Sequence, residues 1–231
     1  MRNIFAGLIR YHRFLAWQSL YPLLFSSAFA LALFTARVLY SHTIYYNNLV
    51  WNLFLAWLPY LFSFAGISIH HLFPGKWWMI IIPGSLWLIF FPNAPYIVTD
   101  FLHLDERPFV PIWYDILLLA SFAWTGLFLA IASLRTMQIL VRRYLGNIMS
   151  WLFTLAALSL SGLGIYLGRF SRWNSWDLLF QPKEVIRDVA THLANPFDNL
   201  RFFAFSILFT VFLLVSYLMF LSMRKENETI E

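Results

Sequence analysis

The chain has 231 residues, of which 61% are hydrophobic and only 12% are charged, and its net charge is +5. A soluble domain of this size has about 45–50% apolar and about 25% charged residues, so the composition excludes an ordinary water-soluble fold. The 25 Phe, 11 Trp and 11 Tyr would leave large apolar patches in water, and long apolar runs therefore indicate membrane spans. The absence of cysteine excludes disulfides and thiol catalysis. Basic residues flank apolar runs, which favours membrane anchoring, and no nucleic-acid partner is expected.

Six apolar runs approach the roughly 20 residues that a helix needs to cross the hydrocarbon core. They predict an all-α, polytopic helical membrane protein in which residues 1–231 form a single integral membrane domain. The third run is short and contains Pro83-Gly84, so it is expected to be kinked or tilted. The expected spans are Leu20–Tyr40, Leu49–Ile69, Trp77–Phe91, Ile112–Leu134, Ile148–Leu167 and Phe202–Leu221.

The first run also has features of a signal peptide. Arg2, Arg10 and Arg13 precede it, and Ala28-Phe29-Ala30 resembles a cleavage site. The run continues beyond that site, so a retained span is expected. Arg37, near the end of this span, is expected to reach the membrane interface by snorkelling.

The loop charges predict an orientation. Lys and Arg are concentrated in the N-terminal segment, the 70–76 and 135–147 loops and the C-terminal tail, whereas the two short loops on the other side carry only Arg107. The positive-inside rule therefore predicts that both termini are cytoplasmic. The 92–111 and 168–201 loops then face outward, on the same side of the membrane.

The first unusual polar stretch is FFPNAPYIVTDFLHL, residues 90 to 104. Pro92 is expected to end the third span, and Asn93-Ala94-Pro95 is expected to form a turn. Residues 96–104 are then expected to form a short helix that lies along the interface or re-enters the protein. Asp100 and His103 are three residues apart and share a face of that helix.

The second polar stretch is GRFSRWNSWDLL, residues 168 to 179. Its two tryptophans suit the membrane–water interface. Arg169 and Arg172 are forked donors that match phosphate or carboxylate groups. Asp177 is expected to be available as a partner for one of them.

Together, PNAPYIVTDFLHL and GRFSRWNSWDLL resemble the domain of unknown function 1361 family of bacterial multi-pass membrane proteins. The resemblance covers most of the chain, from about the first span to the last. It implies a membrane location and supplies no established activity; with the predicted orientation, the expected location is the bacterial cytoplasmic (plasma) membrane. The positions that look like the signature of the family are Asn93, Pro95, Tyr96, Asp100, Arg169, Trp173, Asn174 and Asp177.

Two interpretations of the polar residues remain open. In the functional one, a site on the outer face binds or processes a lipid headgroup or another anion. Asp100, His103 and Asp177 are its candidate catalytic acids and bases, and the candidate anion- or lipid-binding residues are Asn93, Tyr96, Arg169, Arg172 and Asn174. In the structural one, Asp100 or Asp177 simply neutralises Arg169, because charges in a low dielectric are usually paired.

Other polar features carry less information. The D-x-x-H spacing supplies only two ligands, so no metal site is predicted, and the cofactor remains unknown. Asp115 is expected to favour the N-terminus of the fourth span through the helix dipole, and His70-His71 is expected to be a cytoplasmic interfacial turn. The apolar positions from Pro182 to Asn195 predict an amphipathic helix that caps the polar stretches.

Three classes of function therefore remain open. The first is a membrane enzyme, or a lipid- or anion-binding protein, that works at the outer face. The alternatives are a transporter or channel subunit and a non-catalytic assembly or partner protein. Few ionisable residues lie inside the predicted spans, which argues against an ion pathway. Membrane lipids are the expected contacts, whereas protein partners and enzymatic activity are left undetermined.

Overall fold

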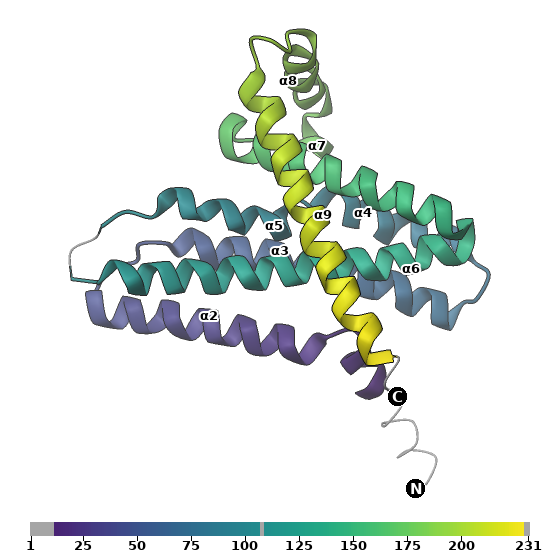
Figure 1. The fold of residues 1–231 in the computed structure, drawn as a ribbon, viewed down its shortest axis with the longest axis horizontal. Helices are drawn as coiled ribbons and strands as arrows, with labels where there is room; N and C mark the ends of the chain where they lie inside the picture. The colour runs from purple at the N-terminus through teal and green to yellow at the C-terminus, as the bar shows by residue number, and fades with distance from the viewer. Residues whose placement is uncertain (1–11, 107–108, 229–231) are drawn as a thin grey trace, which may run out of the picture.

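The computed structural model describes residues 12–106 and 109–228, with side chains described up to residue 223. Five helical segments are long and apolar enough to cross a membrane, which fits the expected all-α, polytopic fold (Figure 1). These segments are Leu20–Ser41, Asn47–Leu72, Trp77–His103, Ile112–Ser171 and Leu200–Met223. Arg2, Arg10 and Arg107, which entered the predicted orientation, lie outside the described residues.

Three predicted spans correspond directly to single helices. They are α2 (Leu20–Ser41), α3 (Asn47–Leu72) and α9 (Leu200–Glu228). Each helix extends somewhat beyond the predicted apolar run, because polar residues at the ends continue the helical hydrogen bonding. Pro59 lies inside α3 without ending it.

The fourth and fifth predicted spans are two arms of one long helical segment, α6 (Ile112–Tyr166). Gly146 interrupts it with φ 86° and ψ 176°, a conformation that suits glycine and is not helical. Figure 1 shows the chain reversing direction there, so that the second arm returns along the first. The predicted 135–147 loop is therefore wrong: helix continues through most of it, and the connection is reduced to the turn at Gly146. The fourth and fifth predicted spans therefore lie in one of the five candidate segments, as two helical arms on either side of this turn.

The third span is longer than predicted. The 3-10 turn η1 (Trp77–Ile80) leads into α4 (Ile81–Phe90), and α5 (Asn93–Tyr96) and η2 (Ile97–His103) follow almost directly. α4 ends at Phe90, just before Pro92, but the backbone keeps helical angles across this break: Pro92 has φ −59° and ψ −25°, and the amide of Tyr96 donates to the carbonyl of Pro92. The amide of Ala94 donates to the carbonyl of Phe91, which partly compensates for the donors that the two prolines lack. The chain thus continues as one span-length segment to His103. The expected short helix corresponds to η2, whose Ile97, Thr99 and Asp100 are buried, whereas the predicted turn at Asn93-Ala94-Pro95 is wrong because these residues are helical.

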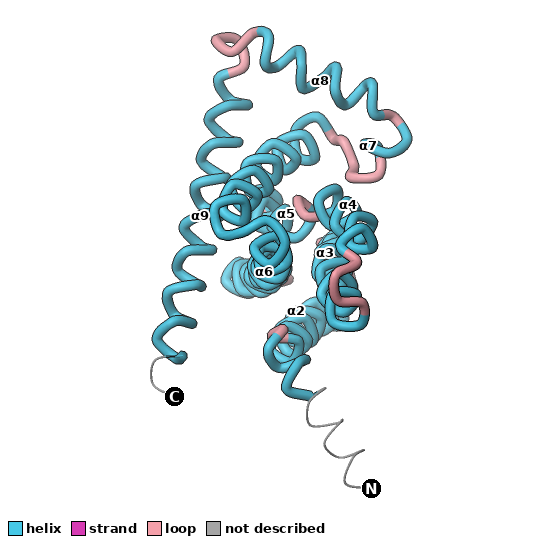
Figure 2. The backbone as a smooth tube through the Cα atoms, turned by 90° about the vertical axis from the view of Figure 1, so that its right-hand side faces the viewer, coloured by secondary structure: helices cyan, strands magenta, loops and turns pink. Residues whose placement is uncertain are grey.

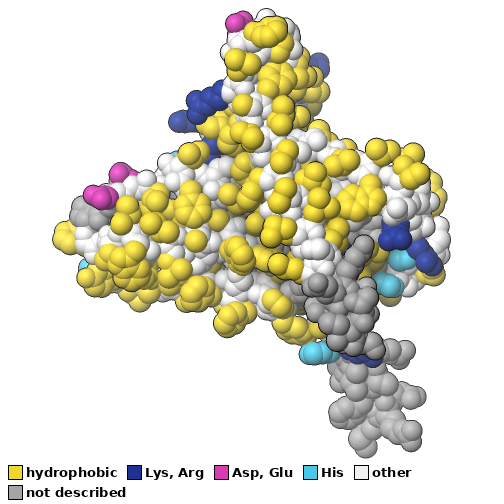
Figure 3. Space-filling view, viewed as in Figure 1, with side chains coloured by type: hydrophobic (Ala, Val, Ile, Leu, Met, Phe, Trp, Pro, Cys, Tyr) yellow, Lys and Arg dark blue, Asp and Glu magenta, His cyan; other side chains and the backbone are white. Residues whose placement is uncertain are grey.

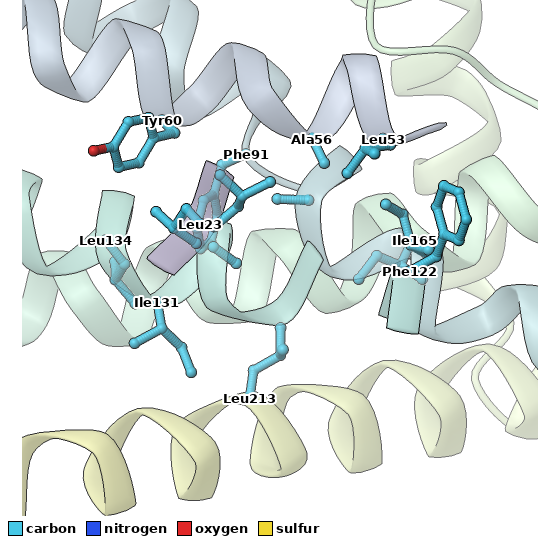
Figure 4. Close-up of a cluster of buried hydrophobic side chains, with 14 of the residues drawn as sticks. Leu23, Leu53, Ala56, Tyr60, Phe91, Phe122, Ile131, Leu134, Ile165 and Leu213 are labelled. Carbon is cyan, nitrogen blue, oxygen red and sulfur yellow. The ribbon is translucent and has the colours of Figure 1, made fainter. Parts of the chain in front are cut away.

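The hydrophobic core joins all the long helices. It includes Leu23 from α2, Tyr60 from α3, Phe122 and Ile165 from the two arms of α6, and Leu213 from α9 (Figure 4). Outside this core, a large apolar surface remains: yellow side chains cover much of the face drawn in Figure 3. Such a surface is stable only in lipid or detergent, which agrees with an integral membrane protein.

Two short helices lie between α6 and α9. The π-helical turn η3 (Leu167–Ser171) ends the second arm of α6, and α7 (Asp177–Phe180) and α8 (Pro182–Ala194) follow. Figure 2 shows α8 spanning the distance from α7 to the start of α9, above the ends of the other helices. Figures 1 and 2 also show α9 crossing the bundle at a steep angle. The predicted amphipathic helix is confirmed as α8, with Pro182 in its first turn.

A buried ion pair joins α2 to α6. Arg37 Nε donates to Asp115 Oδ1 at 2.6 Å and Nη2 donates to Oδ2 at 3.0 Å, and both side chains are almost fully buried. Arg37 also lies over the ring of Tyr46, 5.0 Å from its centroid. The predicted snorkelling of Arg37 is therefore wrong, because Asp115 provides a carboxylate inside the bundle. Asp115 lies in the first turn of α6, where the helix dipole favours a negative charge, and its ion pair also links the first span to the fourth.

Candidate functional site

The two polar stretches meet at Arg169, which lies in η3. Its Nη2 donates to Asp100 Oδ1 at 2.6 Å, and Nε and Nη2 donate to Thr99 Oγ1 at 2.9 and 2.6 Å. Its guanidinium carbon lies 4.4 Å from the centroid of the Tyr96 ring, a cation–π contact. Arg169 therefore contacts two signature positions of the first polar stretch, Tyr96 and Asp100, although Asp100 lies 69 positions earlier in the sequence.

Asp100 is the most buried member of this group, and its side chain is only 1% exposed. Its second carboxylate oxygen accepts a hydrogen bond from Asn52 Nδ2 of α3 at 2.8 Å. Both oxygens are thus engaged within the protein, as a buried carboxylate requires. We call Asn52, Thr99, Asp100, His103 and Arg169 the polar cluster.

His103 completes the polar cluster at its exposed edge. Arg169 Nη1 and His103 Nε2 are 2.6 Å apart. A guanidinium can only donate, so Nε2 is the acceptor in this contact. All three guanidinium nitrogens of Arg169 consequently have protein partners, and both oxygens of its counter-charge Asp100 are hydrogen-bonded.

A pocket of about 450 Å³ lies beside the polar cluster. Its walls come from α3, the α4–α5 junction, the second arm of α6, the 173–178 segment and α8, so we call it the α8 pocket. The lining is mainly apolar, with a few polar groups from Asn52, Asn93, Tyr96, Asn174 and Ser175. The exposed side chains among its lining residues are Trp51, Leu88, Leu160, Asn174, Leu178 and Ile186.

Asn93 links the two signature stretches across this pocket. Its Oδ1 accepts a hydrogen bond from Ser175 Oγ at 3.0 Å. Its Nδ2 is buried and has no hydrogen-bond partner in the protein. The pocket therefore has a mainly apolar lining, and one of its lining residues carries a buried amide donor that has no partner within the protein.

The close packing of the α5 segment explains the positions of three glycines. A Cβ on Gly126, in the first arm of α6, would clash with the carbonyl oxygen of Ala94. On the second arm, Gly164 lies against Pro92 and Gly168 against Tyr96. The segment is thus held between the two arms, and this packing positions Asn93 and Tyr96 at the pocket.

The remaining predicted site residues lie apart from the polar cluster. Asp177 Oδ2 accepts hydrogen bonds from the backbone amide of Asn174 at 2.7 Å and from its side-chain nitrogen at 3.2 Å. These bonds fix the turn before α7, so Asp177 has a local role, and Arg169 pairs with Asp100. Arg172 is exposed in a left-handed conformation, φ 62°, and is not among the residues that line the pocket. Trp173 Nε1 donates to Asp188 Oδ2 at 2.9 Å, which attaches the 168–176 segment to α8.

Two residues of the polar cluster were missed by sequence reasoning. Thr99 is directly beside Asp100 and could have been noticed as a hydroxyl on the same segment. Asn52 gave a weaker signal, a single amide in an apolar span. A polar side chain inside a membrane span is energetically costly unless it has a hydrogen-bonding partner. The presence of Asn52 and Thr99 in apolar segments could therefore have indicated that each has a polar partner in the fold. No group of three or more His, Asp or Glu side chains suited to a metal ion occurs within the described part of the chain.

Comparison with known proteins identifies the family. The family model described as "Protein of unknown function (DUF1361)" matches residues 51–216, which contain the polar cluster, the α8 pocket and both signature stretches. The chain therefore belongs to the domain of unknown function 1361 family, as the two motifs indicated. No match was found among curated proteins or among solved structures.

Proposed function

We propose that this protein binds a lipid-like amphiphile in the α8 pocket. The observation that carries the proposal is a pocket of about 450 Å³ with a mainly apolar lining and the unpartnered amide nitrogen of Asn93. Ligand pockets commonly combine apolar walls with a few placed polar groups. The apolar walls suit an acyl or isoprenoid chain, and Asn93, with Ser175 beside it, suits a polar group such as an ester or hydroxyl.

The exposed residues of the lining support access from the membrane. Five of the six exposed lining side chains are apolar, among them Trp51, Leu88 and Leu160 on span helices. A ligand that enters between such side chains comes from lipid more readily than from water.

Arg169 supports this site in a different way from the expected one. An incoming anion would compete with Asp100, which holds the guanidinium at 2.6 Å. We assign Arg169 the role of positioning Tyr96 and closing the bundle beside the pocket. This assignment favours recognition of a neutral polar group with an apolar chain over recognition of a bare anion.

A photoactivatable lipid tests the proposal in membranes. A diazirine on the acyl chain should label Leu55, Leu167 and Val185, which line the pocket and are buried from bulk lipid. Labelling confined to exposed residues such as Phe25 and Ile207 would show that the lipid does not enter the pocket, and would contradict the proposal.

We further propose that the protein is one integral domain of a bacterial plasma membrane with both termini in the cytoplasm. The Lys and Arg distribution supports this orientation, because the Gly146 turn carries Arg142 and Arg143 beside it. The natural absence of cysteine permits a direct test. An impermeant thiol reagent should label Glu184→Cys in intact cells, and should label Asn147→Cys only after the cells are opened. The reverse pattern would invert the topology.

A further inference from the structure

A second pocket lies at the opposite end of α3 from Asn52. It has a volume of about 700 Å³ and is lined by His70 and His71 in the last turn of α3 and by Arg142 and Arg143 near the end of the first α6 arm. The apolar side chains of Ile67 and Leu140 also contribute to the lining. We call it the basic pocket.

The two arginines of the basic pocket differ from the two buried arginines of the bundle. Arg37 and Arg169 each hold a carboxylate, Asp115 and Asp100 respectively. Arg142 and Arg143 are exposed, and neither guanidinium has a hydrogen bond or ion pair with another described residue.

The sequence around the basic pocket supplies no counter-charge. The chain has no Asp or Glu before Asp100 and none between Asp115 and Asp177. All the lining residues fall in these two acid-free stretches. Figure 3 shows basic and His side chains gathered at this end of the molecule. Because no acidic side chain is among the described residues that line the pocket, an anion there would meet positive charge that the lining does not compensate.

The local geometry also favours a hydrogen-bonded anion. His70 Nδ1 and the hydroxyl of Tyr144 are 2.6 Å apart, which fixes the imidazole ring. This contact leaves Nε2 of His70 for a ligand. Arginine side chains match phosphate oxygens as forked donors, and the pocket lies at the end of a span, the depth at which lipid phosphates lie.

We infer that the basic pocket binds an anionic phosphate group, carried by a phospholipid headgroup or by a soluble phosphate compound. The combination of two arginines, two histidines and apolar walls recognises phosphate on a partly apolar molecule. The inference is independent of the ligand proposed for the α8 pocket, since the two pockets share no lining residue.

Binding to the purified full-length protein in detergent tests this inference. The probes are short-chain phosphatidylglycerol, short-chain phosphatidylcholine and inorganic phosphate, with adducts counted by native mass spectrometry. Phosphatidylglycerol should bind more tightly than zwitterionic phosphatidylcholine. Arg142→Gln and Arg143→Gln should each weaken its binding about fivefold, the effect of one basic residue near an anionic surface.

Lys76→Gln is the matched control, because it removes one charge from the same end of the bundle at a residue outside the pocket lining. It should change the affinity less than twofold. Equal losses for Lys76→Gln and Arg143→Gln would overturn the inference in favour of diffuse surface attraction, as would equal binding of the two lipids.

Inorganic phosphate distinguishes the two sources of the ligand. If millimolar phosphate displaces phosphatidylglycerol from the wild type, the pocket recognises a soluble phosphate compound. If the lipid stays bound, the pocket recognises a headgroup. The gel-filtration profile of each variant checks that the fold is retained.

Discussion

At the scale of single residues, the buried charges of this protein are used to join helices. Asp100 and Arg169 connect the third span to the end of α6, and Arg37 and Asp115 connect α2 to the start of α6. A buried charge without its partner is expensive, so each pair makes the position of one helix depend on the other.

The Asp100–Arg169 pair should behave as one unit in a double-mutant cycle. Asp100→Ala and Arg169→Ala should each lower the free energy of unfolding by about 3–5 kcal/mol, because each leaves a buried charge unpaired. The double variant should lose much less than the sum of the two. Unfolding in mixed detergent micelles, followed by tryptophan fluorescence, measures these losses.

Arg172→Ala is the control for this cycle. Arg172 is exposed three residues from Arg169, and its loss should leave the unfolding free energy close to that of the wild type. Strict additivity of the Asp100 and Arg169 losses would show that the two side chains do not act together.

Sequence reasoning found one of these pairs and missed the other. The sequence predicts Asp100 or Asp177 as the partner of Arg169, because both acids lie in unusual polar stretches on the same predicted side of the membrane, and the structure selects Asp100. Arg37 and Asp115 are 78 positions apart, and each has a plausible local explanation at a span end. Only the packing of α2 against α6 reveals that each supplies the other's counter-charge.

At the scale of elements, the α5 segment depends on the helical hairpin that surrounds it. Ala94 touches Gly126 on one arm of α6, and Pro92 touches Gly164 on the other. The sequence predicted a turn at Asn93-Ala94-Pro95 because two prolines usually end a helix. The contacts across the hairpin override that preference, and they are invisible in a linear sequence.

A pair of glycine substitutions tests this packing. Gly126→Ala should lower the free energy of unfolding by about 1–3 kcal/mol, because the new Cβ would overlap the carbonyl oxygen of Ala94. In Gly84→Ala, the nearest atom to the new Cβ would be Met137 Cε at 3.5 Å, an ordinary contact.

The Gly84→Ala variant should be as stable as the wild type or more stable, because alanine favours helix. Thermal unfolding in detergent compares the two variants directly. A harmless Gly126→Ala would mean that α5 is not held tightly between the arms of α6.

At the scale of the whole molecule, the amino-acid composition was enough to predict an all-α membrane protein. It was not enough to predict where a ligand pocket would lie. The apolar content and the run lengths predicted an all-α membrane protein, and the five long apolar helical segments confirm it. The α8 pocket was not predicted, since its lining residues range from Trp51 to Val189 and most are ordinary apolar side chains. A pocket of this kind arises from how α8 and the hairpin are arranged, which no local pattern encodes.

The most direct test of the amphiphile pocket is native mass spectrometry of the protein released gently from its own membrane. Val189→Trp should fill the pocket, because Val189 lines it from α8. Ala190→Trp is the matched control, since Ala190 is the next residue on α8, is exposed and is not a lining residue. The account predicts a retained lipid-sized adduct on the wild type and on Ala190→Trp that is lost from Val189→Trp. An adduct equally present on all three proteins, or absent from the wild type, would contradict it.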